Sequence, residues 1–467
     1  MVYNITQKVK LKDPRRGEKM IKQRLFNFNK IERASSEVTP RAGLILFDGF
    51  MKALKVDKMM EKHMPVPGSN RGHKAWEYIR PISLMQYGGG LHIADLREIR
   101  EDKVLREATG MGVVPSESGM GDWLWRMGSG EGLKRMKLAH KELVRRMLLL
   151  DDTQEYTLWV DPTITDLKDK AYAQMTYSGV RGDRPILVGL KELPIFVHHE
   201  YRQGNAMGGT TQALREGFEA VESAGKKIKH VAADSELYIG DNINYIRSKG
   251  ATFTIVADKD AAVTEVIRHI PAIDWKPFYD KDGIKTDREI AVTVHAMAKT
   301  EAFSLVVLRW RKAQPDLFSP DPYCYHAIAT DLKVDAADVI EIHRESIPDP
   351  CKAVWEYNQR AQMENMLKEL KGGFGAEHMP CGSFEANAMY FSISVLTYNL
   401  TIAQKYLVIQ EGLQKSAIAT LRWKLLQIPA WIAKHGNRVY LKIATSVEKF
   451  NHYIRMLNRI KAIAASP

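Results

Sequence analysis

Apolar residues recur every three or four positions over residues 41–150, the spacing typical of amphipathic helices. The first of these runs carries Leu44, Leu46, Phe47, Phe50, Met51 and Leu54. Further helices are predicted within 75–87, 93–107 and 132–150. The preceding residues, 1–40, are polar and basic and lack this periodicity, so we expect a flexible arm followed by a helical domain.

The pattern changes at about Thr153, where β-branched and aromatic residues gather between turn formers. The segments that predict strands are TQEYTLWVDPTI, RPILVGL, LPIFVHHEY, KKIKHVAAD and ATFTIVAD. A helix is predicted over 213–224, and strands joined by helices indicate an α/β sheet buried on both faces. Residues 286–345 look β-rich and irregular, a helix is predicted over 355–373, and most of 385–463 is predicted to be helical.

Composition places the chain among ordinary globular proteins, with 467 residues of which 45% are hydrophobic and 27% charged. We find no apolar run long enough for a membrane span and no secretory signal at the N-terminus. The three cysteines are scattered without metal-ligand spacing, which predicts reduced thiols rather than a zinc site. These features favour a cytoplasmic protein.

The net charge of +12 is concentrated at the two ends of the chain. Residues 1–33 hold ten Lys or Arg against three Asp or Glu, and residues 401–467 hold eleven against two. Basic ends around a slightly acidic middle suit a protein that grips a polyanion and performs chemistry at its centre. A charge that serves solubility alone is the alternative, and composition does not decide between the two.

Two predicted strands end on a carboxylate. The run YTLWVD stops at Asp161, before a proline that cannot extend a central strand, and the run KHVAAD stops at Asp234. Ligands of open α/β sheets bind just outside the carboxyl ends of the strands, where two acids could hold a metal ion. Taken singly, each aspartate is more often a turn former or a helix cap.

The helix predicted over 355–373 carries a narrow polar stripe. Arg360, Glu364 and Lys371 follow Tyr357 at offsets of 3, 7 and 14 residues. At about 100° per residue, all four fall within an arc of about 60°. Two other acids of this helix, Glu356 and Glu369, point elsewhere by the same arithmetic.

Phosphodiester chemistry explains this mixture of residues. Carboxylates can hold two Mg²⁺ or Mn²⁺ ions, hard cations that prefer oxygen ligands. Arg360 can bind a phosphate with two hydrogen bonds, Lys371 offers a second charge, and Tyr357 can donate a hydrogen bond to phosphate or support a base. We therefore take Asp161, Asp234 and Glu364 as candidate catalytic and metal-binding residues.

The spacing Tyr-x2-Arg-x3-Glu-x6-Lys resembles the signature of DDE insertion-sequence transposases. The segments WVDPT, YRQGNAMGG, HVAADSELY and YNQRAQMENMLKELKGGFG are similar to the thirteen-eighty group in particular. The resemblance runs from about residue 40 to the C-terminus. It implies a ribonuclease-H-like catalytic core interrupted by a β-rich insertion, with Asp161 on the first strand and Asp234 after the fourth. Glu236 departs from the pattern, because such sequences often have glycine there.

The resulting division of the chain has six parts. They are a basic flexible arm (1–40), a helical DNA-binding domain (41–150), the first part of the core (151–260), a β-rich insertion (261–350), the second part of the core (351–400) and a basic helical C-terminal region (401–467).

Two further residues are candidates for DNA binding. In related transposases a tryptophan of the insertion stacks on a flipped base, and Trp310 is the candidate here, with packing in a small core as the alternative. Arg126 lies in a predicted short helix capped by Ser116 or Ser118 and could contact phosphate or a base. The tryptophans beside it, Trp123 and Trp125, are expected to pack in a core.

The leading hypothesis is cut-and-paste transposition in a prokaryotic cytoplasm, on the nucleoid. Metal-activated water would cut at the terminal inverted repeats, and the freed 3′-hydroxyl would attack target DNA. Because two ends must be held together, a homodimer on double-stranded DNA is expected. The alternatives are a metal-dependent nuclease without strand transfer and a non-catalytic DNA-binding protein descended from a transposase.

Overall fold

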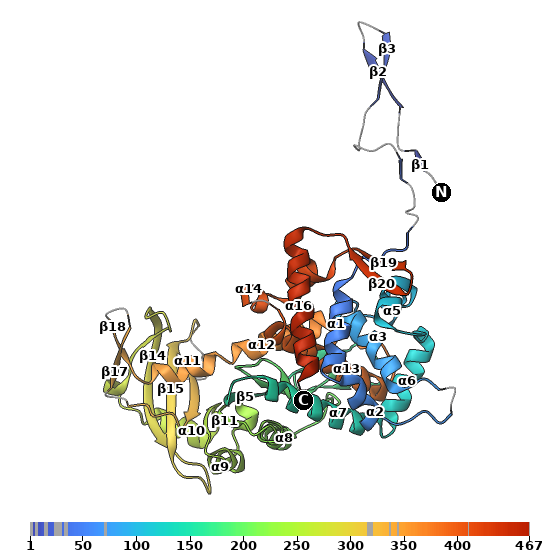
Figure 1. Ribbon diagram of the computed structural model, residues 1–467. Helices are drawn as coiled ribbons and strands as arrows, with labels where there is room; N and C mark the ends of the chain where they lie inside the picture. Colours follow the sequence, from blue (N-terminus) through green and yellow to red (C-terminus); the bar gives the residue numbers. More distant parts are fainter. Residues whose placement is uncertain are drawn as a thin grey trace.

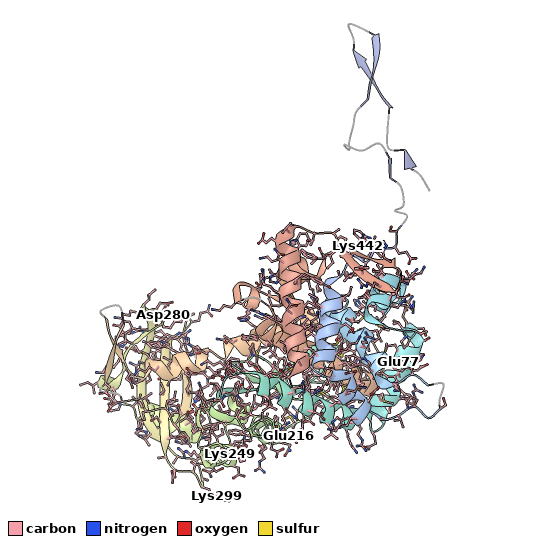
Figure 2. The ribbon with its side chains drawn as sticks, in the orientation of Figure 1. Glu77, Glu216, Lys249, Asp280, Lys299 and Lys442 are labelled. Carbon is pink, nitrogen blue, oxygen red and sulfur yellow. The ribbon has the colours of Figure 1, made fainter. Side chains whose placement is uncertain are left out.

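A computed structural model describes most of the chain and shows its arrangement (Figure 1). The described residues are 3–4, 8–13, 17–22, 30–31, 36–69, 72–314, 321–335, 338–342, 345–409 and 411–466. Much of the expected arm, 1–40, lies outside these residues. Asp280, in the β-rich part, and Glu77, in the N-terminal helices, lie on opposite sides of the view (Figure 2).

Helices form the first large block, as the apolar periodicity predicts. Its helices are α1 (Gly43–Ala53), α2 (Val56–His63), α3 (Ala75–Gly88), α4 (Leu96–Glu101), α5 (Lys103–Thr109), α6 (Glu117–Ser129) and α7 (Gly132–Leu150). Ser116 caps α6 by accepting a hydrogen bond from the Gly119 amide, as expected. Trp123 is buried and stacks on Tyr78 with ring centroids 4.7 Å apart. The expectation of core packing is wrong for Trp125, which is 55% exposed because it lies on the outer face of α6.

Nine of the described strands form one mixed sheet. Their order from edge to edge is β10 (Phe196–Glu200), β9 (Ile186–Leu190), β5 (Glu155–Pro162), β11 (Lys227–Ala233), β12 (Thr252–Val256), β16 (Tyr323–Thr330), β15 (Phe303–Arg311), β14 (Lys285–His295) and β13 (Lys276–Tyr279). β5, β11 and β12 are parallel, and the other pairs are antiparallel. All five strands predicted from sequence are present.

Helices cover both faces of the central strands, which explains why β9 is buried at every position. On one face, Gly217 of α8 (Thr210–Glu222) lies so close to Val188 that an added Cβ would come within 2.7 Å of its side chain. On the other face, a Cβ on Gly189 would come within 2.9 Å of Met366. Successive strand residues point to opposite faces, so two helices approach β9 from opposite sides.

The β-rich segment extends this sheet. Thr254 of β12 pairs with Thr330 of β16, so β13–β16 continue the same hydrogen-bonded ladder. The segment begins with a helix, α10 (Ala261–Arg268), and also holds the pair β17 (Val339–Ile342) and β18 (Glu345–Pro348). A small apolar cluster lies against these strands: Phe278, Ile290, Val306, Leu308, Ile328, Ile347, Cys351, Ala353 and Val354.

The C-terminal region is not helical throughout, which corrects the prediction for 401–467. Its principal helices are α13 (Phe384–Leu407) and α16 (Val447–Ala465), and the latter packs on α1. Between them β19 (Ala430–His435) and β20 (Arg438–Ile443) form a hairpin. Gly436 takes a φ of +56° in its two-residue turn, a conformation that glycine adopts without strain.

No helix in the described part of the chain is both long enough and apolar enough to span a membrane. The long helix α13 is buried over most of its length and carries polar side chains that bond to its neighbours. Asn399, for example, bonds to both the amide and the carbonyl of Phe196 at the start of β10. This helix therefore ties the helical block to the sheet.

Two buried histidines meet where α7, β10 and α13 pack together. His140 and His199 are each 2% exposed, and their rings lie edge to face with centroids 4.7 Å apart. Asn399 bonds to His140, and Ser392 bonds to His199. Burial lowers the pKa of His140 to about 3 and the pKa of His199 well below its usual value.

These histidines should make the fold sensitive to acid. Both are neutral when folded and regain an ordinary pKa near 6.5 when unfolded, so unfolding takes up protons below that pH. The contribution of the two neutral histidines to the free energy of unfolding is therefore fully present above about pH 6.5 and is lost as the pH falls below it. From pH 7.5 to 5.5 we expect a loss of about 1 kcal/mol for each histidine, measurable by urea unfolding. His140→Gln should reduce this pH dependence and the exposed His435→Gln should not; unfolding insensitive to pH would contradict the prediction.

Candidate active site

Parallel pairing of β5 and β11 brings two carboxylates together. Val160 aligns with Ala233 across the pair, and the next residue on each side is Asp161 or Asp234. Asp161 is 8% exposed, and the Asp234 side chain accepts a hydrogen bond from the Glu236 amide. Both predicted aspartates therefore lie side by side at the carboxyl edge of the sheet.

The third predicted carboxylate lies on a helix that is not continuous. The single helix expected over 355–373 is divided into α11 (Cys351–Asn358), α12 (Ala361–Lys368) and a π-turn, Glu369–Gly373. At the junction the Arg360 amide bonds to the Tyr357 carbonyl, and the Met363 amide bonds to the Arg360 carbonyl. These three-residue spacings tighten the chain between the two helices.

Close packing against β9 positions α12. Met363 and Met366 are buried over Gly189, where any side chain would push the helix away. Glu364 lies between these two methionines in sequence and is exposed. Its charge is close enough to Asp161 to contribute to raising the pKa of that aspartate. The fold thus brings Glu364 to the edge that holds both aspartates.

Arg360 joins the helix junction directly to the first aspartate. Its Nη1 lies 2.8 Å from Asp161 Oδ2, and its guanidinium lies over the Tyr357 ring at 5.7 Å. Burial raises the pKa of Asp161 to about 6, an effect that the positive charge of Arg360 opposes. Burial also raises the pKa of Asp234, and Arg360 again opposes the shift.

Lys371, the last residue of the stripe, binds the segment that follows Asp161. Its Nζ donates to Thr163 Oγ1 at 2.7 Å and to the Ile164 carbonyl at 2.6 Å. The π-turn places it there, because the wider turn shifts the side chain from its α-helical position. Burial lowers the pKa of Lys371. All four stripe residues are therefore brought close to the carboxyl edge.

The chemistry of the donor set fits a hard divalent cation, since three carboxylates offer only oxygen ligands. Within the described ranges, no group of three or more His, Cys, Asp or Glu is close enough to hold an ion. Arg360 instead supplies positive charge to Asp161. Asp161, Asp234 and Glu364 are the residues that would hold a metal at this edge.

The two other acids of this segment are turned away, as predicted. Glu356 pairs with Lys191 at 2.7 Å, and Glu369 accepts a hydrogen bond from the Ile418 amide. The angular argument therefore correctly separated Glu356 and Glu369 from the stripe, even though the helix is divided.

The two remaining DNA-binding candidates lie on other elements, Trp310 on β15 and Arg126 on α6. Trp310 and Tyr357 both pack against the apolar cluster of the β-rich segment, and Arg288 lies over the Trp310 ring at 4.9 Å. Arg126 is exposed on α6, next to the exposed Trp125.

Several residues around the site were not selected from the sequence as site residues. Arg184 is buried and forms an ion pair with Glu236, the residue that departs from the family pattern. Thr163 anchors Lys371, and Asp258 after β12 acts electrostatically on Asp234. The position of Asp258 after a strand was visible in the sequence, but the pairing of Arg184 with Glu236 required the fold.

A mixed α/β fold with acids at its carboxyl edge and cations beside them defines a candidate phosphoryl-transfer enzyme. The family model described as "Transposase DDE domain group 1" matches residues 30–465. The chain therefore belongs to this family and is a DNA transposase, an enzyme that cleaves DNA and transfers strands.

A solved structure is also similar to the chain. It is the piggyBac transposase in a synaptic complex with hairpin DNA, with 10% sequence identity and a TM-score of 0.46. The similarity covers 93% of this chain and 85% of the other. No curated protein matches the chain.

Loss of Arg360 should leave the buried Asp161 carboxylate without its cation. We expect Arg360→Gln to lower the free energy of unfolding by about 2 kcal/mol in metal-free buffer. Adding Asp161→Asn should recover most of that loss, because the remaining pair is neutral. Urea unfolding of the two single variants and the double variant measures the coupling; strictly additive losses would show that the ion pair contributes nothing.

Proposed function

We propose that this transposase works by a cut-and-paste reaction in which Asp161, Asp234 and Glu364 hold two Mg²⁺ ions, with Mn²⁺ able to substitute. The observation that supports this is the side-by-side position of Asp161 and Asp234, with Glu364 brought to the same edge. Such ions activate the attacking oxygen and stabilise the leaving one. The same site would serve both cleavage and strand transfer.

We further infer a ribonuclease-H-like core. The strand order β10, β9, β5, β11, β12 supports it, because the first three strands in sequence form an antiparallel meander and the next two pair in parallel. In this division the core comprises 151–260 and 351–400, and 261–350 is an insertion. The continuous sheet through β16 then makes the insertion an extension of the core rather than a detached domain.

The cationic side chains of this chain would position the DNA strand. Arg360 offers a planar guanidinium that suits a phosphate, and Lys371 offers a compact charge next to the segment that follows Asp161. Tyr357, below the Arg360 guanidinium, would orient it. Positioning and electrostatics do most of the work in such reactions, since the protein supplies no covalent step.

The remaining parts of the chain would hold the DNA ends and the target. Arg126 on the exposed face of α6, together with the basic arm and the basic C-terminal region, suits contact with a DNA backbone. Two transposon ends must be joined in one reaction, so we propose a homodimer on DNA. We place this activity in a prokaryotic cytoplasm, on the nucleoid.

Removal of any one carboxylate should abolish DNA cleavage. We expect Asp161→Asn, Asp234→Asn and Glu364→Gln to lose cleavage of the DNA ends that flank the coding sequence, in Mg²⁺ or Mn²⁺. Binding of the same DNA, measured by gel shift in EDTA, should be largely retained because the DNA-holding cations remain.

Glu369→Gln is the matched control for Glu364→Gln, since both residues lie on the same helical segment. This control should cleave like the wild type. Near-normal cleavage by one of the three carboxylate variants would remove that residue from the proposed site.

The two cations of the stripe should each account for one phosphate contact. Arg360→Gln and Lys371→Met should each reduce the slope of log affinity against log salt by about 0.9. Lys191→Met is the control, because Lys191 pairs with Glu356 away from the carboxylates. Fluorescence anisotropy in EDTA over a salt series measures these slopes, and an unchanged slope would mean that the residue does not contact phosphate.

A further inference from the structure

An exposed aromatic ring lies in the short sheet that follows β5. This sheet consists of β6 (Thr165–Asp166), β8 (Arg181–Asp183) and β7 (Gln174–Met175). Tyr177 occupies the turn between β7 and β8 and is 74% exposed. The Arg184 guanidinium lies over its ring at 4.9 Å. One face of the ring is thus supported by a cation, and the side chain is otherwise largely open to solvent.

Arg184 is held in place from several sides. Its side chain is 5% exposed, donates to the Ala206 carbonyl at 3.2 Å and forms an ion pair with Glu236. The Glu236 amide in turn donates to Asp234 Oδ1 at 3.2 Å. A rigid series of contacts therefore runs from the exposed ring of Tyr177 to the second catalytic carboxylate. It also explains Glu236, which supplies the negative charge that a buried arginine requires.

Two exposed methionines belong to the segments next to Tyr177 and Arg184. Met175, on the strand before the turn, is 55% exposed, and Met207, next to the Ala206 carbonyl that binds Arg184, is 81% exposed. Exposed apolar side chains grouped beside an active site are a feature of binding surfaces. A flat, exposed ring supported by a cation suits the face of a nucleobase.

Trp310 is less suited to receive a base without rearrangement. Its side chain is partly buried against the apolar cluster of the β-rich segment, which leaves less of the ring open to a base. Tyr177 presents more of its ring to solvent, and Arg184 and Glu236 link it directly to Asp234.

We propose that Tyr177, supported by Arg184, is a stacking platform for an unpaired DNA base next to the Asp234 side of the active site. This inference rests on the proposed function and deepens it by naming a contact to a splayed strand. Stacking is tolerant of sequence, because every base has a flat face. The platform would hold a strand end that has separated from its complement.

Binding of forked DNA tests the proposal without requiring catalysis. The probes are a duplex with one splayed arm carrying 2-aminopurine and the same duplex fully paired, each titrated with the full chain in EDTA. Tyr177→Ala should weaken binding of the fork about tenfold, as expected for one lost stacking contact. It should change binding of the paired duplex less than twofold and abolish quenching of 2-aminopurine.

Two variants test whether the ring of Tyr177, rather than the turn around it, binds the base. Tyr177→Phe keeps the ring and should bind the fork like the wild type. Ser178→Ala, an exposed neighbour in the same turn, should also bind both probes like the wild type. Because Tyr177 is exposed, its alanine variant should keep the thermal midpoint of the wild type.

Three results would overturn the proposal. The first is that Tyr177→Ala binds the fork as tightly as the wild type, and the second is that it binds the forked and the paired DNA more weakly by the same factor. The third is that Tyr177→Ala changes the self-association of the protein without DNA, which would assign the surface to a protein partner. Failure of the proposed function would look different: the wild type would not cleave DNA in Mg²⁺, while selective binding of the fork in EDTA would still depend on Tyr177.

Discussion

Parallel pairing of β5 with β11 is the constraint on which the rest of the structure depends. The two strands are separated by more than sixty residues of sequence, yet their register aligns Val160 with Ala233 and so places the following aspartates together. Both strands are buried at consecutive positions, and a shift of one residue would exchange the side chains that pack against the helices on each face. The same apolar packing that stabilises the sheet therefore also sets the spacing of the carboxylates.

Helix α12 completes the site through a close contact that only glycine permits. Because Gly189 has no side chain, Met363 and Met366 pack directly against β9, and this packing determines the position of Glu364. The break before α12 turns Arg360 toward Asp161, where its charge balances a carboxylate that burial would otherwise favour in its neutral form. The π-turn after α12 then directs Lys371 back to Thr163. Each irregularity of this segment brings one polar side chain to the carboxyl edge of the sheet.

A second charged pair, Arg184 with Glu236, stabilises the carboxyl edge on the side of Asp234. A buried guanidinium without a counter-charge would be costly, and Glu236 removes that cost while its amide binds Asp234. Glu236 thus has a defined partner in this chain. The pair also supports the exposed Tyr177 ring.

The sequence alone determined the elements whose periodicity is strong. The five strands of the first part of the core, the helices of the N-terminal block and the cap at Ser116 all follow the predicted pattern, because local propensity and burial agree there. Helical arithmetic also separated Glu364 from Glu356 and Glu369. Wrong predictions arose where short segments carry weak signals, as at the 430–443 hairpin and the exposed Trp125.

Only the tertiary structure decided which side chains meet. Nothing local in the sequence pairs Arg184 with Glu236, Lys371 with Thr163 or Arg360 with Asp161, since these partners are far apart in the chain. Whether β13–β16 form a separate sheet or extend the first one was likewise settled by the pairing of β12 with β16. Periodicity records which face of an element is buried, whereas long-range register and packing determine what that face touches.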